Sequence, residues 1–150
     1  MELSENIRNY LKTRPYSNYE IKDNKFIING NVNENFHHLK RLTEGDLNNF
    51  IIKGNLKLDI TFMPNNCINN SIIEGDLYLN NLKEISENCF TNTVINKNVY
   101  LYSLEYLPKN FYLDVKGEIV FTRLKSKLLK KLLKFPGISR QLAFNLLKNY

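Results

Sequence analysis

The sequence predicts an α+β fold: a short parallel β-solenoid of about four to five rungs, capped by an N-terminal helix and a C-terminal helical hairpin. Two separate repeated patterns predict the solenoid, and helically spaced apolar residues at both ends predict the caps. A chain of 150 residues fits one domain. We expect an N-terminal helix and lead-in (1–27), a repeat solenoid (28–122) and a basic helical hairpin (123–150).

A pattern of about seven residues recurs along the chain and is the first sign of the solenoid. Each full copy runs from an apolar residue, through Gly or Lys and a polar residue, into a short apolar strand. The copies start 20 to 24 residues apart, a spacing that is typical of solenoids. They are Ile52–Leu58, Ile73–Leu79, Ile95–Leu101 and Val115–Phe121, with a weaker copy at Ile28–Val32.

A second pattern keeps the same period and lies in the other half of each repeat. Its copies, Met63–Cys67, Ile85–Cys89 and Leu107–Phe111, share an apolar residue, Pro or Ser, Asn, and then Cys or Phe. A position that accepts both Cys and Phe is an apolar core position, so we expect two buried free thiols. No disulfide is expected in a cytosolic chain. A zinc site is rejected, because only His37 and His38 in another segment could complete it.

In the best-formed copy, Leu101, Leu104, Leu107 and Phe111 follow an L-x-x-L-x-x-L-P-x-x-F rhythm, and the repeat also contains a Gly-Asp-Leu-x-Leu strand. This pattern resembles the leucine-rich repeats of the short bacterial and viral kind. No fixed asparagine ladder follows that strand in the sequence. The resemblance covers roughly residues 28–122 and implies a solenoid that binds along a repeated surface.

Side chains in each predicted strand alternate between two faces. The predicted inward pairs are Leu56 with Leu58, Leu77 with Leu79, Val99 with Leu101, and Ile119 with Phe121. The Gly before each strand suits a corner, where a positive φ or a close backbone approach excludes a Cβ. Lys97 replaces that Gly in the third copy.

The outward side chains of the strands form the first candidate site. Tyrosines on adjacent rungs make a broad amphipathic patch of the kind that supplies binding hot spots. The alternative interpretation is that tyrosine simply favours strands. The candidate protein-binding residues are Lys57, Asp59, Tyr78, Asn80, Tyr100 and Tyr102.

The N-terminal segment predicts a capping helix. Leu3, Ile7, Tyr10 and Leu11 recur at helical spacing, and Pro15 ends the helix. The first residues lack the features of a secretory signal, and no apolar run is long enough to cross a bilayer. We therefore expect a cytoplasmic protein without membrane contact. Heavy use of Asn, Ile and Lys suggests an AT-rich genome, so the cell is a bacterium or an infected host cell.

Positive charge is concentrated at the C-terminus. Residues 116–150 contain nine Lys or Arg and one acid, about +8, whereas the chain as a whole is +6. The residues before 116 therefore carry about −2. This asymmetry suggests an anionic partner for the C-terminal end.

The same segment contains a hairpin pattern formed by Phe135, Pro136, Gly137, Ile138 and Ala143. This pattern resembles the helix-hairpin-helix of DNA-binding proteins, although Ser139 replaces the second Gly of that motif. The resemblance implies that backbone N–H groups at the start of the second helix bind a phosphate, independently of base sequence. The alternative is a capping hairpin with ordinary solvated charge, and the two roles are compatible. The candidate nucleic-acid-binding residues are Lys130, Lys131, Lys134, Gly137, Ser139 and Arg140.

No motif in the chain indicates catalysis: it lacks a phosphate loop, a paired-carboxylate motif, a metal-ligand cluster and a nucleophile elbow. We therefore expect no enzyme, no cofactor and no metal. The leading hypothesis is a non-catalytic module that docks on a protein partner, such as a phage-type inhibitor or adaptor of a nucleic-acid-handling host complex. A nucleic-acid-binding protein and a structural repeat protein without a discrete site are the alternatives. Homo-oligomers through exposed rung edges remain an open option.

Overall fold

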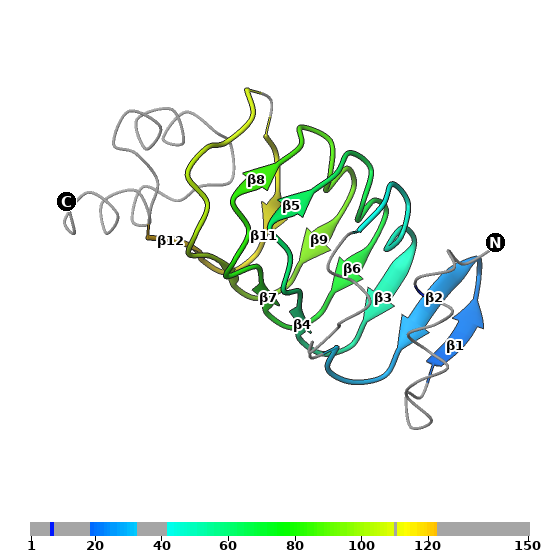
Figure 1. Ribbon diagram of the computed structural model, residues 1–150. Helices are drawn as coiled ribbons and strands as arrows, with labels where there is room; N and C mark the ends of the chain where they lie inside the picture. Colours follow the sequence, from blue (N-terminus) through cyan, green and yellow to red (C-terminus); the bar gives the residue numbers. More distant parts are fainter. Residues whose placement is uncertain (1–6, 8–18, 33–41, 110, 123–150) are drawn as a thin grey trace.

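The computed structural model describes residues 7, 19–32, 42–109 and 111–122, and in this part the chain forms a parallel β-solenoid (Figure 1). Strands and turns make up the solenoid, and no helix is among the named elements of these residues. The predicted C-terminal hairpin lies outside the described residues. So does the predicted N-terminal helix except for Ile7, which is buried in the solenoid core.

In the described residues, twelve short strands form three sheets that run along the solenoid. Sheet A contains β1 (Tyr19–Lys22), β2 (Lys25–Ile28), β3 (Phe50–Ile52), β6 (Ile72–Ile73), β9 (Val94–Ile95) and β11 (Asp114–Val115). Sheet B contains β4 (Leu56–Lys57), β7 (Leu77–Tyr78), β10 (Val99–Leu101) and β12 (Ile119–Phe121). Sheet C contains β5 (Phe62–Met63) and β8 (Glu84–Ile85).

The rungs pass through sheets A and B in turn, two of them also contribute a strand to sheet C, and successive rungs stack in parallel register. Sheet B shows this plainly, because its strand order β12-β10-β7-β4 is the order of the rungs. The solenoid has about four such turns, within the range that the sequence predicts. The weak copy also belongs to the stack, since Val32 forms a parallel bridge with Leu56. β1 is antiparallel to its neighbour and forms a hairpin with β2 at one end of sheet A (Figure 1).

The core is a set of apolar columns that run between the sheets. All four predicted inward pairs of sheet B are buried, with exposed fractions of 4% or less. Phe26 and Phe50 extend the core towards β1, with ring centroids 5.1 Å apart. Cys67 and Cys89 are buried free thiols in the same core, as the sequence predicts.

A ladder of side-chain hydrogen bonds holds the corner between sheets A and B. At this corner the side-chain oxygen of one rung accepts a hydrogen bond from the backbone N–H of the next rung. Four such bonds, 2.8 to 2.9 Å long, link Asn31, Asn55, Asp76, Asn98 and Glu118 in order. An asparagine ladder therefore accompanies the repeat, but it precedes the strand of sheet B instead of following it.

This ladder explains the glycine of the repeat. A Cβ on Gly54 would lie 2.5 Å from Asn31 Oδ1 and 2.6 Å from the Gly30 carbonyl oxygen. Gly75 and Gly117 meet the same obstruction from the rungs before them. None of the three has a positive φ, so close approach is the reason for glycine. The described geometry does not explain why Lys97 is accepted at this position.

Asparagine also forms the turns that lead from sheet C back to sheet A. Asn48 Oδ1 accepts the Asn69 N–H at 2.6 Å, and Asn69 Oδ1 accepts the Thr91 N–H at 3.0 Å. The next residue along has a positive φ on three successive rungs, at Asn49, Asn70 and Asn92. Asparagine tolerates this left-handed conformation better than other side chains do, apart from glycine. The abundance of Asn in the chain therefore has a structural cause.

Candidate binding surfaces

The outward face of sheet B carries the predicted tyrosine site, which we call the tyrosine face (Lys57, Tyr78, Tyr100 and Tyr102). Parallel register places Lys57, Tyr78 and Tyr100 on successive rungs. The Tyr78 and Tyr100 rings stack with centroids 4.7 Å apart and planes 4° apart. Tyr102 meets Tyr100 edge-on at 5.8 Å. The structure thus brings the three predicted tyrosines into one continuous aromatic surface.

A hydrogen bond fixes one end of this surface to the ladder. The Tyr78 hydroxyl donates to Asp76 Oδ2 at 3.1 Å, while Asp76 Oδ1 accepts the Asn98 N–H. Desolvation, together with this hydrogen bond to a carboxylate, raises the pKa of the Tyr78 hydroxyl. Tyr78 is therefore a neutral and anchored side chain at physiological pH.

The flanking residues Asp59 and Asn80 contribute differently. Asp59 is exposed and its Oδ1 accepts a hydrogen bond from Asn81 Nδ2 at 2.5 Å. Asn80 is half-buried and its Oδ1 is buried without a hydrogen-bond partner in the described structure. Lys57 and Tyr102 are exposed, whereas Tyr78 and Tyr100 are half-buried with their rings stacked. The accessible part of the predicted site is therefore the tyrosine face together with Asp59.

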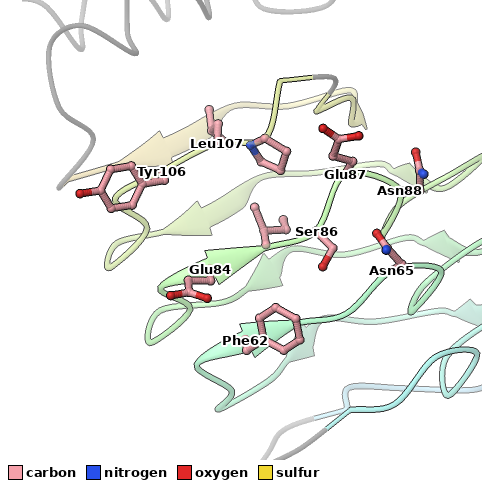
Figure 2. Close-up of a pocket in the computed structure, with 10 residues that line it drawn as sticks. Phe62, Asn65, Glu84, Ser86, Glu87, Asn88, Tyr106 and Leu107 are labelled. Carbon is pink, nitrogen blue, oxygen red and sulfur yellow. The ribbon is translucent and has the colours of Figure 1, made fainter.

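A second surface, which the sequence analysis does not predict, lies over sheet C. It is an open groove of about 560 Å³ (Figure 2). We call it the sheet C groove and define it by Phe62, Glu84, Ser86, Glu87 and Tyr106. Asn65, Ile85, Asn88, Leu107 and Pro108 complete its lining.

Rung stacking builds one wall of the groove. Phe62 pairs with Glu84 in the register of β5 and β8, while the next residues, Met63 and Ile85, point into the core. Tyr106 precedes Leu107 as Glu84 precedes Ile85, so it takes the matching place in the third copy. The wall therefore reads aromatic, carboxylate, aromatic. Phe62 is 49% exposed and Tyr106 is 54% exposed.

Glu87 and two asparagines form the opposite wall. Figure 2 shows Asn65, Glu87 and Asn88 across from the Phe62–Glu84 side, with Ser86 between the two sides. Glu84 and Glu87 are both exposed. Among the described residues, the one ion pair joins Lys116 to Asp114, so neither groove carboxylate is neutralised by a neighbouring cation there.

The two cysteine thiols in the described residues, Cys67 and Cys89, are buried. Burial raises the pKa of Cys89 to about 12, and burial together with the nearby Asp46 raises that of Cys67 well above its ordinary value. Both thiols therefore stay protonated and unreactive at neutral pH. The described residues contain no group of three His, Cys, Asp or Glu side chains that could hold a metal ion. The predicted nucleic-acid-binding residues, Lys130 to Arg140, lie outside the described part of the chain.

The fold and these two surfaces define a parallel β-solenoid with a tyrosine face on one side and an acidic, aromatic groove on another. Comparison with protein-family models, with curated proteins and with solved structures finds no match. The leucine-rich-repeat type that the sequence suggests therefore stays a prediction. In the part of the chain that the structure describes, no helix is long and apolar enough to cross a membrane.

Proposed function

We propose that this protein is a non-catalytic binding module that docks on a protein partner through the tyrosine face. The observation that supports this function is the contact series Tyr78–Tyr100–Tyr102 on the parallel strands of sheet B. Tyrosine combines a large apolar ring with a polar hydroxyl, which is why it is enriched in binding hot spots.

Rigidity is what makes this surface suited to binding. A side chain that is already ordered before binding loses less conformational entropy when a partner arrives. Tyr78 is held by its stack with Tyr100 and by its hydrogen bond to Asp76. The strands beneath are held by the ladder and by backbone hydrogen bonds such as Leu79 N–H to the Tyr100 carbonyl oxygen at 2.9 Å. The face is thus pre-organised before a partner binds.

The uneven distribution of charge along the chain supports the class of partner that we propose. Residues 42–122 hold six Lys and ten Asp or Glu, a net charge of −4, whereas residues 123–150 hold eight Lys or Arg and no acid. A protein of this kind is suited to an assembly that contains both protein and nucleic acid. We therefore propose a phage-type inhibitor or adaptor of a nucleic-acid-handling host complex as its specific role.

Affinity capture with paired variants tests the docking function. The wild-type chain is expected to retain a partner that Tyr78→Ala/Tyr100→Ala loses, with an affinity reduced about 30-fold or more, because a hot spot contributes 2 kcal/mol or more. Tyr112→Ala is the matched control, since Tyr112 is exposed but lies outside the tyrosine face. Equal capture by wild type and the double variant would remove the tyrosine face from the function.

The basic charge of residues 123–150 supports a second candidate function, binding to nucleic acid. We propose Lys130, Lys131, Lys134, Gly137, Ser139 and Arg140 as its residues. Titration of labelled single- and double-stranded DNA and RNA at low and moderate salt tests it. Salt-sensitive binding that Lys134→Glu/Arg140→Glu abolishes supports this function. If wild type fails to bind at low salt, this function is rejected. A purely structural repeat protein would bind neither a protein partner nor nucleic acid.

A further inference from the structure

We propose that the sheet C groove is a second binding site, separate from the tyrosine face, and that its ligand is an extended peptide carrying arginine side chains. The groove lies over β5 and β8, whereas the tyrosine face lies over β4, β7 and β10. The proposal therefore goes beyond the docking function, and either can fail without the other.

The aromatic–carboxylate–aromatic wall matches the chemistry of a guanidinium group. Phe62 lies on the strand beside Glu84, at a strand spacing of about 4.8 Å, and Tyr106 holds the corresponding sequence position in the next copy. Both rings are exposed. A guanidinium group can stack its flat face on Phe62 or Tyr106 while its N–H groups donate to the Glu84 carboxylate. A lysine ammonium group would gain the charge interaction but would lack the planar stacking and the paired donors.

Glu87 offers a place for a second cation. It lies three residues beyond Glu84 along the chain and on the other side of the groove (Figure 2). An extended peptide rises about 3.3 Å per residue. Arginines two or three residues apart can therefore reach Glu84 and Glu87 together. Asn65 and Asn88, beside Glu87, supply amide groups that can pair with the backbone of such a peptide.

The same lining disfavours other ligand classes. No Lys or Arg is among the described residues that line the groove, so its two carboxylates repel nucleic acid and anionic lipid. The carboxylates and amides also make it a poor seat for an apolar helix, whose binding needs a hydrophobic groove. General charge attraction acts on any basic peptide, because residues 42–122 carry a net charge of −4. A preference for arginine over lysine must therefore come from the local arrangement of acids and rings.

The test uses the full chain and a fluorescent peptide of alternating arginine and alanine, titrated by anisotropy at low and moderate salt. We expect saturable binding of one peptide per chain. Glu84→Gln/Glu87→Gln should weaken it about tenfold, since each exposed charge interaction and each cation–π contact contributes modestly. Phe62→Ala/Tyr106→Ala should have a similar effect. A peptide with lysine in place of arginine should bind more weakly.

Two controls separate this site from global effects. Glu74→Gln removes an exposed acid outside the groove and should leave peptide affinity unchanged. Tyr78→Ala/Tyr100→Ala should also leave it unchanged, so a failure of the docking function stays distinguishable from a failure of this proposal. Thermal unfolding of each variant verifies that it is folded at the assay temperature.

Three outcomes would overturn the proposal. The first is the absence of saturable binding by the wild-type chain. The second is unchanged affinity in Glu84→Gln/Glu87→Gln, which would place the peptide elsewhere. The third is equal affinity for the lysine peptide or for a simple polyamine, which would reduce the groove to a site of unspecific charge attraction.

Discussion

The tyrosine face and the sheet C groove lie on different sides of the same rungs, yet their aromatic residues behave differently. On the tyrosine face, aromatic follows aromatic, and Tyr78 stacks on Tyr100 at 4.7 Å. In the groove, Glu84 lies between Phe62 and Tyr106, so the two rings are separated by a carboxylate. On the first surface the rings stack on each other, whereas the second surface exposes two rings and a carboxylate to solvent.

The chain segments beneath these two surfaces also differ in how regular their spacing is from copy to copy. Between sheets A and B every full copy has the same spacing, from Ile52 to Leu56 as from Val115 to Ile119. On the groove side the connection from sheet B to sheet C changes length by one residue, from four residues between Leu58 and Met63 to five between Leu79 and Ile85. The ladder side thus fixes rung geometry, and the groove side tolerates variation. Variation on the groove side can therefore change a binding surface without changing the stack.

The largest effect should follow from breaking the ladder corner with Gly75→Ala. The added Cβ would overlap the Gly54 carbonyl group, whose oxygen lies 2.6 Å from the Cβ position. We expect a loss of about 3 kcal/mol in the free energy of unfolding, at the upper end of overpacking costs. Urea denaturation measures it.

Asn96→Ala is the control for this prediction, because its side chain is exposed and only its backbone bonds to the stack. It should change stability by less than about 0.5 kcal/mol. A Gly75→Ala variant as stable as the control would mean that the corner is not what fixes the rungs.

A smaller effect should follow from removing a single ladder acceptor. Asn55→Ala leaves the Asp76 N–H without the oxygen that accepts it at 2.8 Å. We expect a cost of about 1 to 2 kcal/mol in the same denaturation assay, the penalty for an unsatisfied half-buried donor. Asn55→Asp keeps an oxygen at that place and should lose much less. Equal losses in the two variants would show that shape, not hydrogen bonding, matters at the corner.

The smallest expected effect is a change of the unfolding free energy with pH. It arises from Cys67 and Cys89, the buried thiols in the core on the groove side. Burial raises the pKa of both thiols above the ordinary value of 9.0, so the folded chain holds these protons more tightly than the unfolded chain does. Their contribution to stability is fully present well below pH 9 and is lost as the pH rises from 9 towards 12. Between pH 7 and pH 9 the two thiols together should cost roughly 1 kcal/mol.

Unfolding free energies of the wild type and of Cys67→Ala/Cys89→Ala across this pH range measure the effect. The double variant starts from a lower stability because it leaves cavities in the core, so the informative quantity is the slope with pH. Its slope should be shallower than that of the wild type. Parallel slopes would assign the alkaline loss to other groups.

The inward residues of sheet B could be predicted from the sequence because alternation and period agree there. Leu56 and Leu58 recur with the same spacing in every copy, and burial of such pairs is the main driving force of folding. The tyrosines opposite them follow from the same alternation, but their stacking depends on side-chain rotation, which alternation does not determine.

The groove escaped prediction because its strands are only two residues long. Alternation needs a longer run to be recognised, so Phe62 and Glu84 gave no signal of a shared face. The repeat itself could have indicated the shared face. Phe62, Glu84 and Tyr106 each directly precede the apolar residue that begins the second repeated pattern, Met63, Ile85 or Leu107. The ladder was missed for a related reason. The sequence shows that Asn55 and Asp76 each follow a corner glycine. It does not show the stacking direction, which places the Asn55 side chain against the backbone amide of Asp76 on the next rung.

The ladder gives the solenoid a repeating contact with a defined direction along its axis. Every oxygen in it reaches towards the following rung, at a separation of 21 residues between Asn55 and Asp76. A duplicate of residues 54–74 inserted before Gly75 would present an Asn acceptor to the next rung and a Gly–Asn corner to the previous one. The ladder bond repeats from rung to rung, so a whole rung can be added or removed without changing the chemistry of the ladder. The distance between its two ends is a quantity that gene duplication can set one step at a time.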